Sequence, residues 1–320
     1  MHGKHSLVVI FFKFVFSLCL VFTGPSQDFN EDLRSHTNYR LINDKTCGLV
    51  FHNRIVGGKN AQIGQYPWIA QIRLGLIGND NSSLDLWFLD LQCGGSILNS
   101  LYVLSAAHCF TNPNSDRFGV VLGEHTNSRD PDCELNVCAP SIQYRNIERV
   151  IIHPDYNYIE QLNDIALVRL KHPIEFNDYV KPICLNTDEK ASNFTNEYME
   201  VAGWGGTNAE KRLSDILQSL KLKIAPDNYC SSLYNKMTRH ISIKNVFRNP
   251  IICAGNVKGQ DTCTGDSGGP AMKVLIKDGQ PRYFLIGITS SGSPVCAEGK
   301  PAFFTEVYKY IRWILDNMQP

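Results

Sequence analysis

A serine, a histidine and an aspartate stand in three short motifs whose residue types could work together chemically. Ser267 lies among glycines in Gly-Asp-Ser-Gly-Gly-Pro, where the backbone can turn tightly and direct N–H groups at an anionic oxygen. His108 ends a run of small residues, and Asp164 opens an apolar strand. Acyl transfer needs such a hydroxyl nucleophile, a base and a carboxylate that orients the base. Singly, these residues are more often structural, so only their joint occurrence predicts this chemistry.

The elements that must position these residues are mostly strands. Short apolar runs recur between turn signals, which predicts an all-β sandwich or barrel. The expected strands are residues 69–74, 102–105, 120–122, 165–170, 200–202 and 283–288. One amphipathic helix is expected at the C-terminus, because apolar residues recur there at intervals of three and four. These residues are Val307, Tyr310, Ile311, Ile314 and Leu315.

The charges of the chain balance. Lysine and arginine together number 31, as do aspartate and glutamate, so no overall field attracts nucleic acid or an anionic membrane. A hydrophobic content of 43% can supply a sizeable core in a chain of 320 residues. We therefore expect a globular protein with no nucleic-acid partner.

Residues 1–26 have the pattern of a secretory signal peptide. A polar, basic start precedes an apolar run from Phe14 to Phe22, and small residues follow up to Ser26. A membrane anchor is the alternative. Lys13 interrupts the apolar stretch, however, and no uninterrupted run approaches the roughly 20 residues that span a bilayer. We predict a secreted, extracellular protein that is not attached to a membrane.

Residues 27–54 are polar, contain one cysteine and show no periodic apolar face, which predicts a propeptide rather than a domain. Of the eleven cysteines, Cys19 lies in the predicted signal peptide, and the other ten are an even number in a chain bound for an oxidising compartment, so five disulfides are expected. A zinc site is disfavoured because the chain has no pair of CxxC motifs.

Five motifs, in a fixed order, carry a resemblance to a known family. They are Ile-Val-Gly-Gly at 55–58, Ala-Ala-His-Cys at 106–109, Asp-Ile-Ala-Leu at 164–167, Gly-Trp-Gly at 203–205 and Gly-Asp-Ser-Gly-Gly-Pro at 265–270. With them, the chain resembles the chymotrypsin/trypsin family of serine proteases. The resemblance implies a protease domain over residues 55–320, built from two antiparallel six-stranded β-barrels and a C-terminal α-helix, with the catalytic site between the barrels.

The resemblance also implies a role for each residue of the three motifs. Ser267 is the nucleophile, His108 the general base and later acid, and Asp164 the carboxylate that orients the base. The backbone N–H groups of Gly265 and Ser267 form the oxyanion hole. Catalysis of this kind needs no cofactor.

A specificity pocket is implied by the same resemblance, with Asp261 at its floor and Ser290, Gly292 and Ala302 around it. A carboxylate at the bottom of an apolar slot must be paired, so we expect protein substrates with Arg or Lys at the cleaved bond. Ala302 adds a methyl group to the pocket, and Ser291 replaces the usual tryptophan. The ratio of Arg to Lys cleavage therefore stays open.

Activation is implied to follow cleavage between Arg54 and Ile55. The new Ile55 ammonium group would pair with Asp266, which orders the pocket and the oxyanion hole. An upstream trypsin-like protease is the expected activator, and serpin-type inhibitors are expected to end the activity. The setting would be an extracellular proteolytic cascade, such as haemolymph immunity, or a venom.

Disulfide pairing is likewise taken from the resemblance. The expected pairs are Cys93–Cys109, Cys230–Cys253, Cys263–Cys296, Cys47–Cys184 and Cys133–Cys138. The Cys47–Cys184 pair would keep the cleaved propeptide attached as a light chain. The Cys133–Cys138 loop is similar to the catalytic domains of arthropod clip-domain proteases, and one cysteine in residues 27–54, rather than six, predicts that the clip domain is absent.

The loop after residue 123 resembles the calcium loop of the family, with Glu124 and Asp132 as oxygen ligands. Two interpretations stay open, a structural calcium site and a solvated acidic loop, with a slight preference for calcium. Asn81 and Asn193 begin Asn-x-Ser/Thr sequons, which predicts glycosylation on surface loops.

Other functions stay open. A catalytically silent homologue could act as a binding cofactor, but the intact serine, histidine and aspartate and the pocket residue Asp261 disfavour it. A digestive enzyme would share the chemistry. Such enzymes usually have a short, untethered propeptide, so the expected link from Cys47 to Cys184 counts against this alternative.

Overall fold

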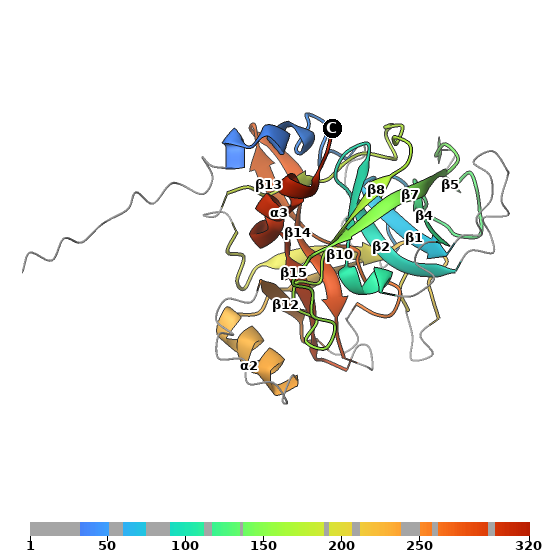
Figure 1. Cartoon of the computed structure of the whole chain (residues 1–320). Coiled ribbons are helices and arrows are strands. Elements are labelled where there is room, and N and C mark those ends of the chain that lie inside the picture. The colour runs from blue at the N-terminus through green and yellow to red at the C-terminus, as the bar shows by residue number, and fades with distance from the viewer. Residues whose placement is uncertain are drawn as a thin grey trace, which may run out of the picture.

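The computed structural model describes ten stretches of the chain. They are residues 33–50, 60–74, 90–111, 117–134, 137–188, 192–206, 212–237, 250–257, 262–293 and 298–320. The expectations for Arg54, Ile55, Asn81, Asp261 and Cys296, and for the signal peptide, fall outside these stretches. Figure 1 shows two groups of strands side by side, with the C-terminal helix against one of them.

The first group of strands is a closed barrel in the order β1-β2-β3-β8-β7-β4. All six neighbouring pairs are antiparallel. The strands are β1 (Ile69–Leu74), β2 (Leu91–Ile97), β3 (Tyr102–Ser105), β4 (Phe118–Leu122), β7 (Gln143–Ile152) and β8 (Ala166–Leu170). Every residue of β3 and β4 is buried, which explains why these strands appear in the sequence as short, almost continuous apolar runs.

The second group is a seven-stranded sheet in the order β11-β10-β13-β14-β15-β12, with β9 paired to β14. Its strands are β9 (Cys184–Leu185), β10 (Tyr198–Gly203), β11 (Gln218–Lys223), β12 (Ile251–Gly255), β13 (Pro270–Lys277), β14 (Gln280–Ser291) and β15 (Pro301–Glu306). The outer strands approach each other at one bridge, Ile224 to Ala254, so this sheet is a partial barrel rather than a second closed one. The pairing of β9 with β14 is parallel, which the expectation of purely antiparallel barrels missed.

Helices and small strands complete the fold. The expected C-terminal helix is present as a 3-10 turn η7 (Val307–Tyr310) that continues into α3 (Ile311–Asn317). The others are η1 (Thr37–Leu41), η3 (Ala107–Phe110), α2 (Asp227–Met237) and the hairpin of β5 (Cys133–Glu134) and β6 (Val137–Cys138). Across the described stretches, no helix combines the length and the apolar character needed to cross a membrane.

One hydrophobic core joins the two groups of strands. The same buried cluster holds Leu104 and Leu167 of the first barrel together with Met272 and Ile288 of the second sheet. At this junction, the indole Nε1 of Trp68 donates a hydrogen bond to Sδ of Met272 at 2.9 Å. Because both groups of strands share one tightly packed apolar core, side chains at their junction can be held in fixed positions.

Candidate active site

The structure brings His108 and Asp164 together at the junction of the two barrels. Nδ1 of His108 lies 2.8 Å from Oδ2 of Asp164, and the backbone N–H of His108 donates to Oδ1 of the same carboxylate at 2.9 Å. Asp164 is fully buried, whereas the His108 side chain keeps about a fifth of its surface exposed. The carboxylate therefore fixes both the backbone and the ring of His108.

Two side chains from the second barrel hold Asp164 in turn. Oγ of Ser290, on β14, donates to Oδ2 of Asp164 at 2.5 Å, and Oγ1 of Thr305, on β15, donates to its backbone carbonyl at 2.9 Å. A buried carboxylate is stable only when its oxygens accept hydrogen bonds. Both barrels thus contribute to the position of this one aspartate.

Ser267 lies on a turn that packs directly against the histidine segment. The carbonyl of Ser267 accepts a hydrogen bond of 2.7 Å from the N–H of Gly94. The next residue, Gly268, has φ +78°, and a Cβ there would lie 2.2 Å from Oγ of Ser105 and 3.2 Å from the N of Ala106. Only glycine can approach the strand before His108 so closely. The serine turn and the histidine are therefore parts of one packed unit.

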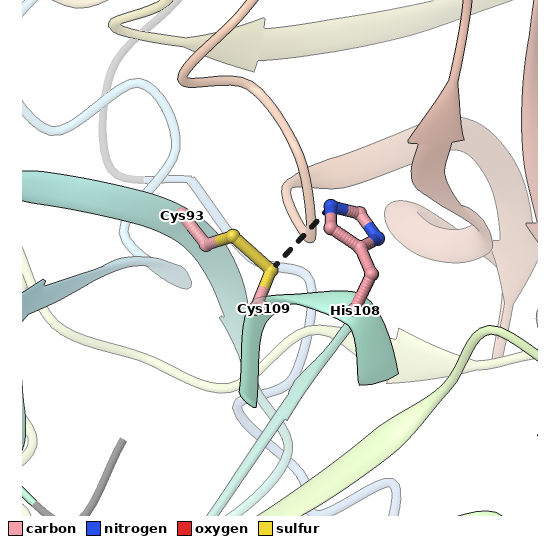
Figure 2. A group of neighbouring side chains, drawn as sticks. All are labelled: Cys93, His108 and Cys109. Carbon is pink, nitrogen blue, oxygen red and sulfur yellow. Dashed lines mark hydrogen bonds between the residues drawn. A yellow bond between two sulfur atoms is a disulfide. The ribbon is translucent and has the colours of Figure 1, made fainter. Parts of the chain in front are cut away.

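The disulfide between Cys93 and Cys109 strengthens this unit. Cys109 follows His108 directly, and Cys93 precedes Gly94, so the bond ties together the two segments that contact the serine turn. Figure 2 shows the imidazole beside the disulfide, with Nε2 of His108 3.9 Å from Sγ of Cys109. The two sulfurs and the ring nitrogen lie within 4.8 Å of one another. They offer no thiolate to a metal, because the sulfurs are bonded to each other.

The backbone around Ser267 leaves two N–H groups available. The N–H of Asp266 donates to the backbone carbonyl of Cys263. The N–H of Gly268 donates to the carbonyl of Thr289, and the N–H of Gly269 to the backbone carbonyl of Asp266. Within the described stretches, the N–H groups of Gly265 and Ser267 have no protein acceptor. Two backbone N–H groups without a protein acceptor are what an oxyanion hole requires.

The carboxylate of Asp266 lies against the Gly-Trp-Gly segment at 203–205. Oδ1 accepts from the N–H of Gly205 at 2.8 Å, and Oδ2 accepts from the N–H of Cys263 at 2.9 Å. A Cβ on Gly205 would lie 2.3 Å from Oδ2. The glycine is therefore required for Asp266 to occupy this position.

Of the expected pocket residues, three are described. Ser290 is 7% exposed and Ala302 is fully buried, on β14 and β15 respectively. A Cβ built on Gly292 would lie 3.8 Å from Cβ of Ala302, so these two residues lie close together. Asp261 lies outside the described residues.

Glu124 and Asp132, the expected calcium ligands, lie close together. Both are buried, and Oε1 of Glu124 and Oδ2 of Asp132 each accept from the N–H of His125 at 3.0 Å. Oδ1 of Asp132 is buried and has no hydrogen-bond partner in the described stretches. The burial of both carboxylates does not fit the interpretation of a solvated acidic loop.

The charge of Glu124 is only partly compensated within the protein. Burial raises the pKa of its carboxyl group to about 7, against the opposing effect of the Arg73 guanidinium. Nη2 of Arg73 lies 3.8 Å from Oε2 of Glu124. A bound cation would relieve the remaining cost of ionising this buried acid.

Four of the expected disulfides are formed. They are Cys47–Cys184, Cys93–Cys109, Cys133–Cys138 and Cys230–Cys253. Cys263 is also disulfide-bonded, and its expected partner Cys296 lies outside the described residues. Asn193, one of the two expected glycosylation sites, is exposed, and its Oδ1 accepts from the N–H of Thr195 at 3.1 Å.

A two-barrel fold with a buried aspartate, a histidine and a glycine-framed serine at the junction defines the chymotrypsin-like class of serine protease. Residues 55–314 match the family described as Trypsin. The chain therefore belongs to the trypsin family of serine endopeptidases.

Individual relatives show which members of this family the chain is similar to. The chain is 36% identical to the Spaetzle-processing enzyme of Drosophila melanogaster, over 88% of this chain and 70% of that protein. It is 34% identical to phenoloxidase-activating factor 3 of Holotrichia diomphalia, over 95% and 82%. Among solved structures, the Drosophila Grass clip serine protease of the Toll pathway matches with a TM-score of 0.69 and 30% identity, over 85% of this chain and 74% of that one. The chain is thus similar to insect clip-domain serine proteases.

Sequence reasoning missed part of the site. Ser290 was expected only as part of the substrate-binding strand. Its hydrogen bond to Asp164 forms because the two barrels pack together, which the local sequence does not indicate. The contact of Thr305 with Asp164 was missed for the same reason. Arg73 beside Glu124 was also missed, although an arginine in an apolar strand is a signal that a buried acid lies nearby.

Proposed function

We propose that this protein is a secreted, trypsin-like endopeptidase zymogen that cleaves peptide bonds after Arg or Lys. The observation that carries the proposal is the link from Ser290 through Asp164 to Nδ1 of His108, beside the packed turn of Ser267. A nucleophile, a base and an orienting carboxylate are what peptide hydrolysis through an acyl-enzyme requires.

In the proposed reaction, Nε2 of His108 takes the proton of Ser267 Oγ as this oxygen attacks the substrate carbonyl. Asp164 stabilises the imidazolium that forms, and the N–H groups of Gly265 and Ser267 bind the oxyanion, each contributing about 3 kcal/mol. His108 then returns the proton to the leaving amine, which departs. Water, deprotonated by the same histidine, then attacks the acyl carbon, and His108 returns this proton to Ser267 Oγ as the ester bond breaks and the acid product leaves.

The substrate side chain is proposed to enter between Gly292 and Ala302 and to pair with Asp261. A guanidinium or ammonium group fits there because a carboxylate at the end of an apolar slot needs a cationic partner. Ser290 would border the same slot through its backbone. Protein substrates with exposed Arg or Lys are therefore the proposed class.

Activation is proposed to occur by cleavage between Arg54 and Ile55, by an upstream trypsin-like protease. The freed ammonium group of Ile55 would pair with Asp266, and this pairing would order the backbone of Gly265 and Ser267. Support comes from the position of Asp266, whose carboxylate lies against Gly205 and accepts hydrogen bonds from the N–H groups of Gly205 and Cys263.

The proposed setting is an extracellular proteolytic cascade, as part of innate immunity. Support comes from the predicted signal peptide over residues 1–26 and from the similarity to the Spaetzle-processing enzyme and phenoloxidase-activating factor 3. Serpin-type inhibitors would end the activity. Calcium at Glu124 and Asp132 and glycans at Asn81 and Asn193 would add stability and solubility.

The test is hydrolysis of short peptide amides by the secreted protein after limited cleavage at Arg54. We expect turnover of amides with Arg or Lys before the cleaved bond and none with Phe or Leu. Ser267→Ala should fold and be secreted but hydrolyse nothing. Turnover that survives in Ser267→Ala would contradict the assigned nucleophile.

A catalytically silent homologue that acts as a binding cofactor remains the alternative function. It would share the fold and the disulfides, so binding assays alone cannot separate the two. Absence of turnover in the cleaved wild-type chain, with cleavage at Arg54 verified by mass, would favour this alternative.

A further inference from the structure

We propose that residues 33–50, here called the light-chain segment, are held on the protease domain by contacts that do not need the Cys47–Cys184 disulfide. After cleavage, the segment would then remain as a non-covalent subunit that caps the C-terminal helix. The formation of a separate light chain rests on the activation cleavage of the proposed function. The contacts that hold residues 33–50 on the protease domain do not depend on that cleavage.

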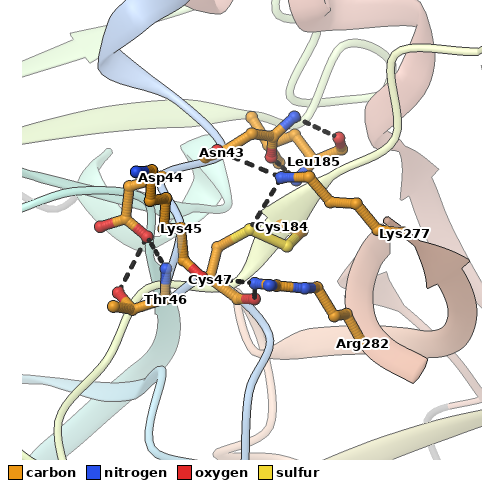
Figure 3. The surroundings of a disulfide bond; sticks show 9 residues. All are labelled: Asn43, Asp44, Lys45, Thr46, Cys47, Cys184, Leu185, Lys277 and Arg282. Atoms are coloured by element: carbon orange, nitrogen blue, oxygen red, sulfur yellow. Dashed lines mark hydrogen bonds between the residues drawn. A yellow bond between two sulfur atoms is a disulfide. The ribbon is translucent and has the colours of Figure 1, made fainter. Parts of the chain in front are cut away.

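Two cations form the first set of contacts, which we call the cation clamp: Lys277 at the end of β13 and Arg282 near the start of β14. Nη1 of Arg282 donates to the carbonyls of Lys45 at 2.7 Å and Cys47 at 3.0 Å. Nζ of Lys277 donates to the carbonyl of Asn43 at 3.1 Å and lies 3.6 Å from Sγ of Cys47. Figure 3 shows both cations converging on the segment around the disulfide.

The clamp is strong because of the charge and burial of its donors. Arg282 is 8% exposed, and hydrogen bonds from a cation are stronger than those between neutral groups. Three alternate carbonyls of the segment depend on these two side chains. If the segment left, two cations on neighbouring strands would lose their acceptors while still partly surrounded by protein.

Hydrogen bonds to the backbone of residues 182–185 and of Tyr283 form the second set. The amide of Asn43 makes two bonds to Leu185 of β9, with its Nδ2 donating to the carbonyl at 2.8 Å and its Oδ1 accepting from the N–H at 2.6 Å. The N–H of Gly48 donates to the carbonyl of Pro182 at 2.9 Å, and its carbonyl accepts from the N–H of Tyr283 at 3.0 Å. The segment is therefore bonded to both β9 and β14, on either side of the clamp.

The third set joins the segment to the C-terminal helix α3. Nδ2 of Asn38 donates to the carbonyls of Leu315 at 3.0 Å and Met318 at 2.9 Å, and thus satisfies carbonyls that a helix end leaves unpaired. Nε2 of His36 lies 3.0 Å from Oδ1 of Asp316. Figure 1 shows the segment, in blue, beside α3, in red.

Apolar burial supports the same contact. Leu33 is fully buried and Ile42 is 4% exposed, and both belong to the core cluster that contains Ile311 and Leu315 of α3. Because α3 has seven residues, it depends on packing rather than on its own propensity. Three separate sets of contacts act together on one short segment, so breaking any single one leaves the others in place.

The first experiment removes the disulfide. A Cys47→Ser, Cys184→Ser variant is made in the Ser267→Ala background, with residues 51–54 replaced by the recognition sequence of an unrelated, sequence-specific protease. The chain is cut by that protease and passed through a gel-filtration column at about 1 μM without denaturant. We expect the light chain to elute with the protease domain; separation of the two would overturn the proposal.

This design keeps the test separate from the proposed function. Cleavage by an unrelated protease needs neither the native activation site nor enzymatic activity, so loss of the light chain from the Ser267→Ala protein would contradict only the present inference. Absence of turnover in the cleaved wild-type chain, with Ser267 in place, would contradict only the proposed function.

The second experiment tests the cation clamp. In the same disulfide-free chain, Lys277→Met and Arg282→Met together should speed the loss of the light chain on dilution at least tenfold. Lys273→Met is the matched control, because Lys273 also lies on β13 but pairs with Glu197 and the carbonyl of Tyr198. Equal rates in the clamp variant and the control would overturn the assigned clamp.

If the Cys47→Ser, Cys184→Ser variant fails to fold, hydrogen exchange is measured instead on the cut chain with its disulfide intact. The N–H groups of Gly48 and Tyr283 should exchange within threefold of their rates in the uncut chain. Acceleration of both by a hundredfold or more would show that only the disulfide holds the segment, and would overturn the proposal.

Discussion

Oδ2 of Asp164 accepts a hydrogen bond of 2.5 Å from Oγ of Ser290 and lies 2.8 Å from Nδ1 of His108. One oxygen thus receives a donor from β14 of the second barrel and faces the histidine of the first. The orientation of the His108 ring consequently depends on how the two barrels pack. A shift between them would move the base relative to Ser267.

Ser290→Ala should lower kcat/KM for Arg amides by about 10- to 100-fold, because a hydrogen bond to a charged group contributes about 1.5–3 kcal/mol. The loss should fall mainly on kcat, since the hydroxyl orients the base through Asp164. Steady-state kinetics of the cleaved enzyme measure it. Ser293→Ala, which removes a hydroxyl that donates to exposed Glu298, is the control and should be unchanged.

Gly205→Ala should reduce activity roughly 100-fold or more, because the new methyl group would lie 2.3 Å from Oδ2 of Asp266 and would force this carboxylate to move. Asp266 lies between Gly265 and Ser267, the two residues of the proposed oxyanion hole. Gly279→Asn is a suitable control, since nothing lies within 4 Å of a Cβ at that hairpin tip. Full activity in Gly205→Ala would show that the position of Asp266 does not matter.

Asp261→Ser should lower kcat/KM for Arg and Lys amides by about two to four orders of magnitude, as expected when a buried charge pair loses one partner at about 3–5 kcal/mol. Asp178→Ser, at an exposed pair with Lys181, should have no effect. A variant at position 261 that still prefers Arg would place the floor of the pocket elsewhere.

Calcium should raise the melting temperature of the wild-type protein by about 5 °C at a concentration a hundred times the dissociation constant, since binding to the folded state alone stabilises it by about 2.7 kcal/mol. Glu124→Ala should abolish this shift. Glu134→Gln, an exposed acid of the same loop, should keep it. Identical melting curves in calcium and in chelator would rule out the site.

The strands that sequence could locate are those with strong local patterns. Residues 69–74 and 102–105 were expected as strands and are β1 and β3 with the same bounds. Their residues are almost wholly buried, so burial and β-propensity agree. The C-terminal helix was found for a similar reason, because its apolar residues repeat at helical spacing and face the core.

The elements that sequence missed depend on tertiary contacts. Helix α2 is rich in Ser, Asn and Tyr, which are poor helix formers, and it is held by the Cys230–Cys253 disulfide and by the hydroxyl of Tyr234, which donates to the carbonyl of Glu160. The light-chain segment shows no periodic apolar face, yet it buries Leu33 and Ile42. It is held by contacts with β9, β14 and α3, and by the hydrogen bond from Asn99 to the carbonyl of Leu41.

Within the site, the motifs predicted that His108 and Asp164 meet, but not what holds them. The three motifs of His108, Asp164 and Ser267 are local in sequence, whereas the contacts of Ser290 and Thr305 with Asp164 join residues more than a hundred positions apart. No short sequence motif indicates a contact between residues so far apart in the chain. These supporting contacts become visible only when the barrels are placed together.

Labelling of Ser267 by a fluorophosphonate tests the central claim most directly. The chain cut between Arg54 and Ile55 should take up one equivalent of the reagent, and the adduct mass should lie on the tryptic peptide that contains Ser267. The Arg54→Gln chain and Ser267→Ala should remain unlabelled under the same conditions. Equal labelling of the cut and uncut chains, or an adduct on another residue, would contradict the account of a zymogen whose nucleophile is Ser267.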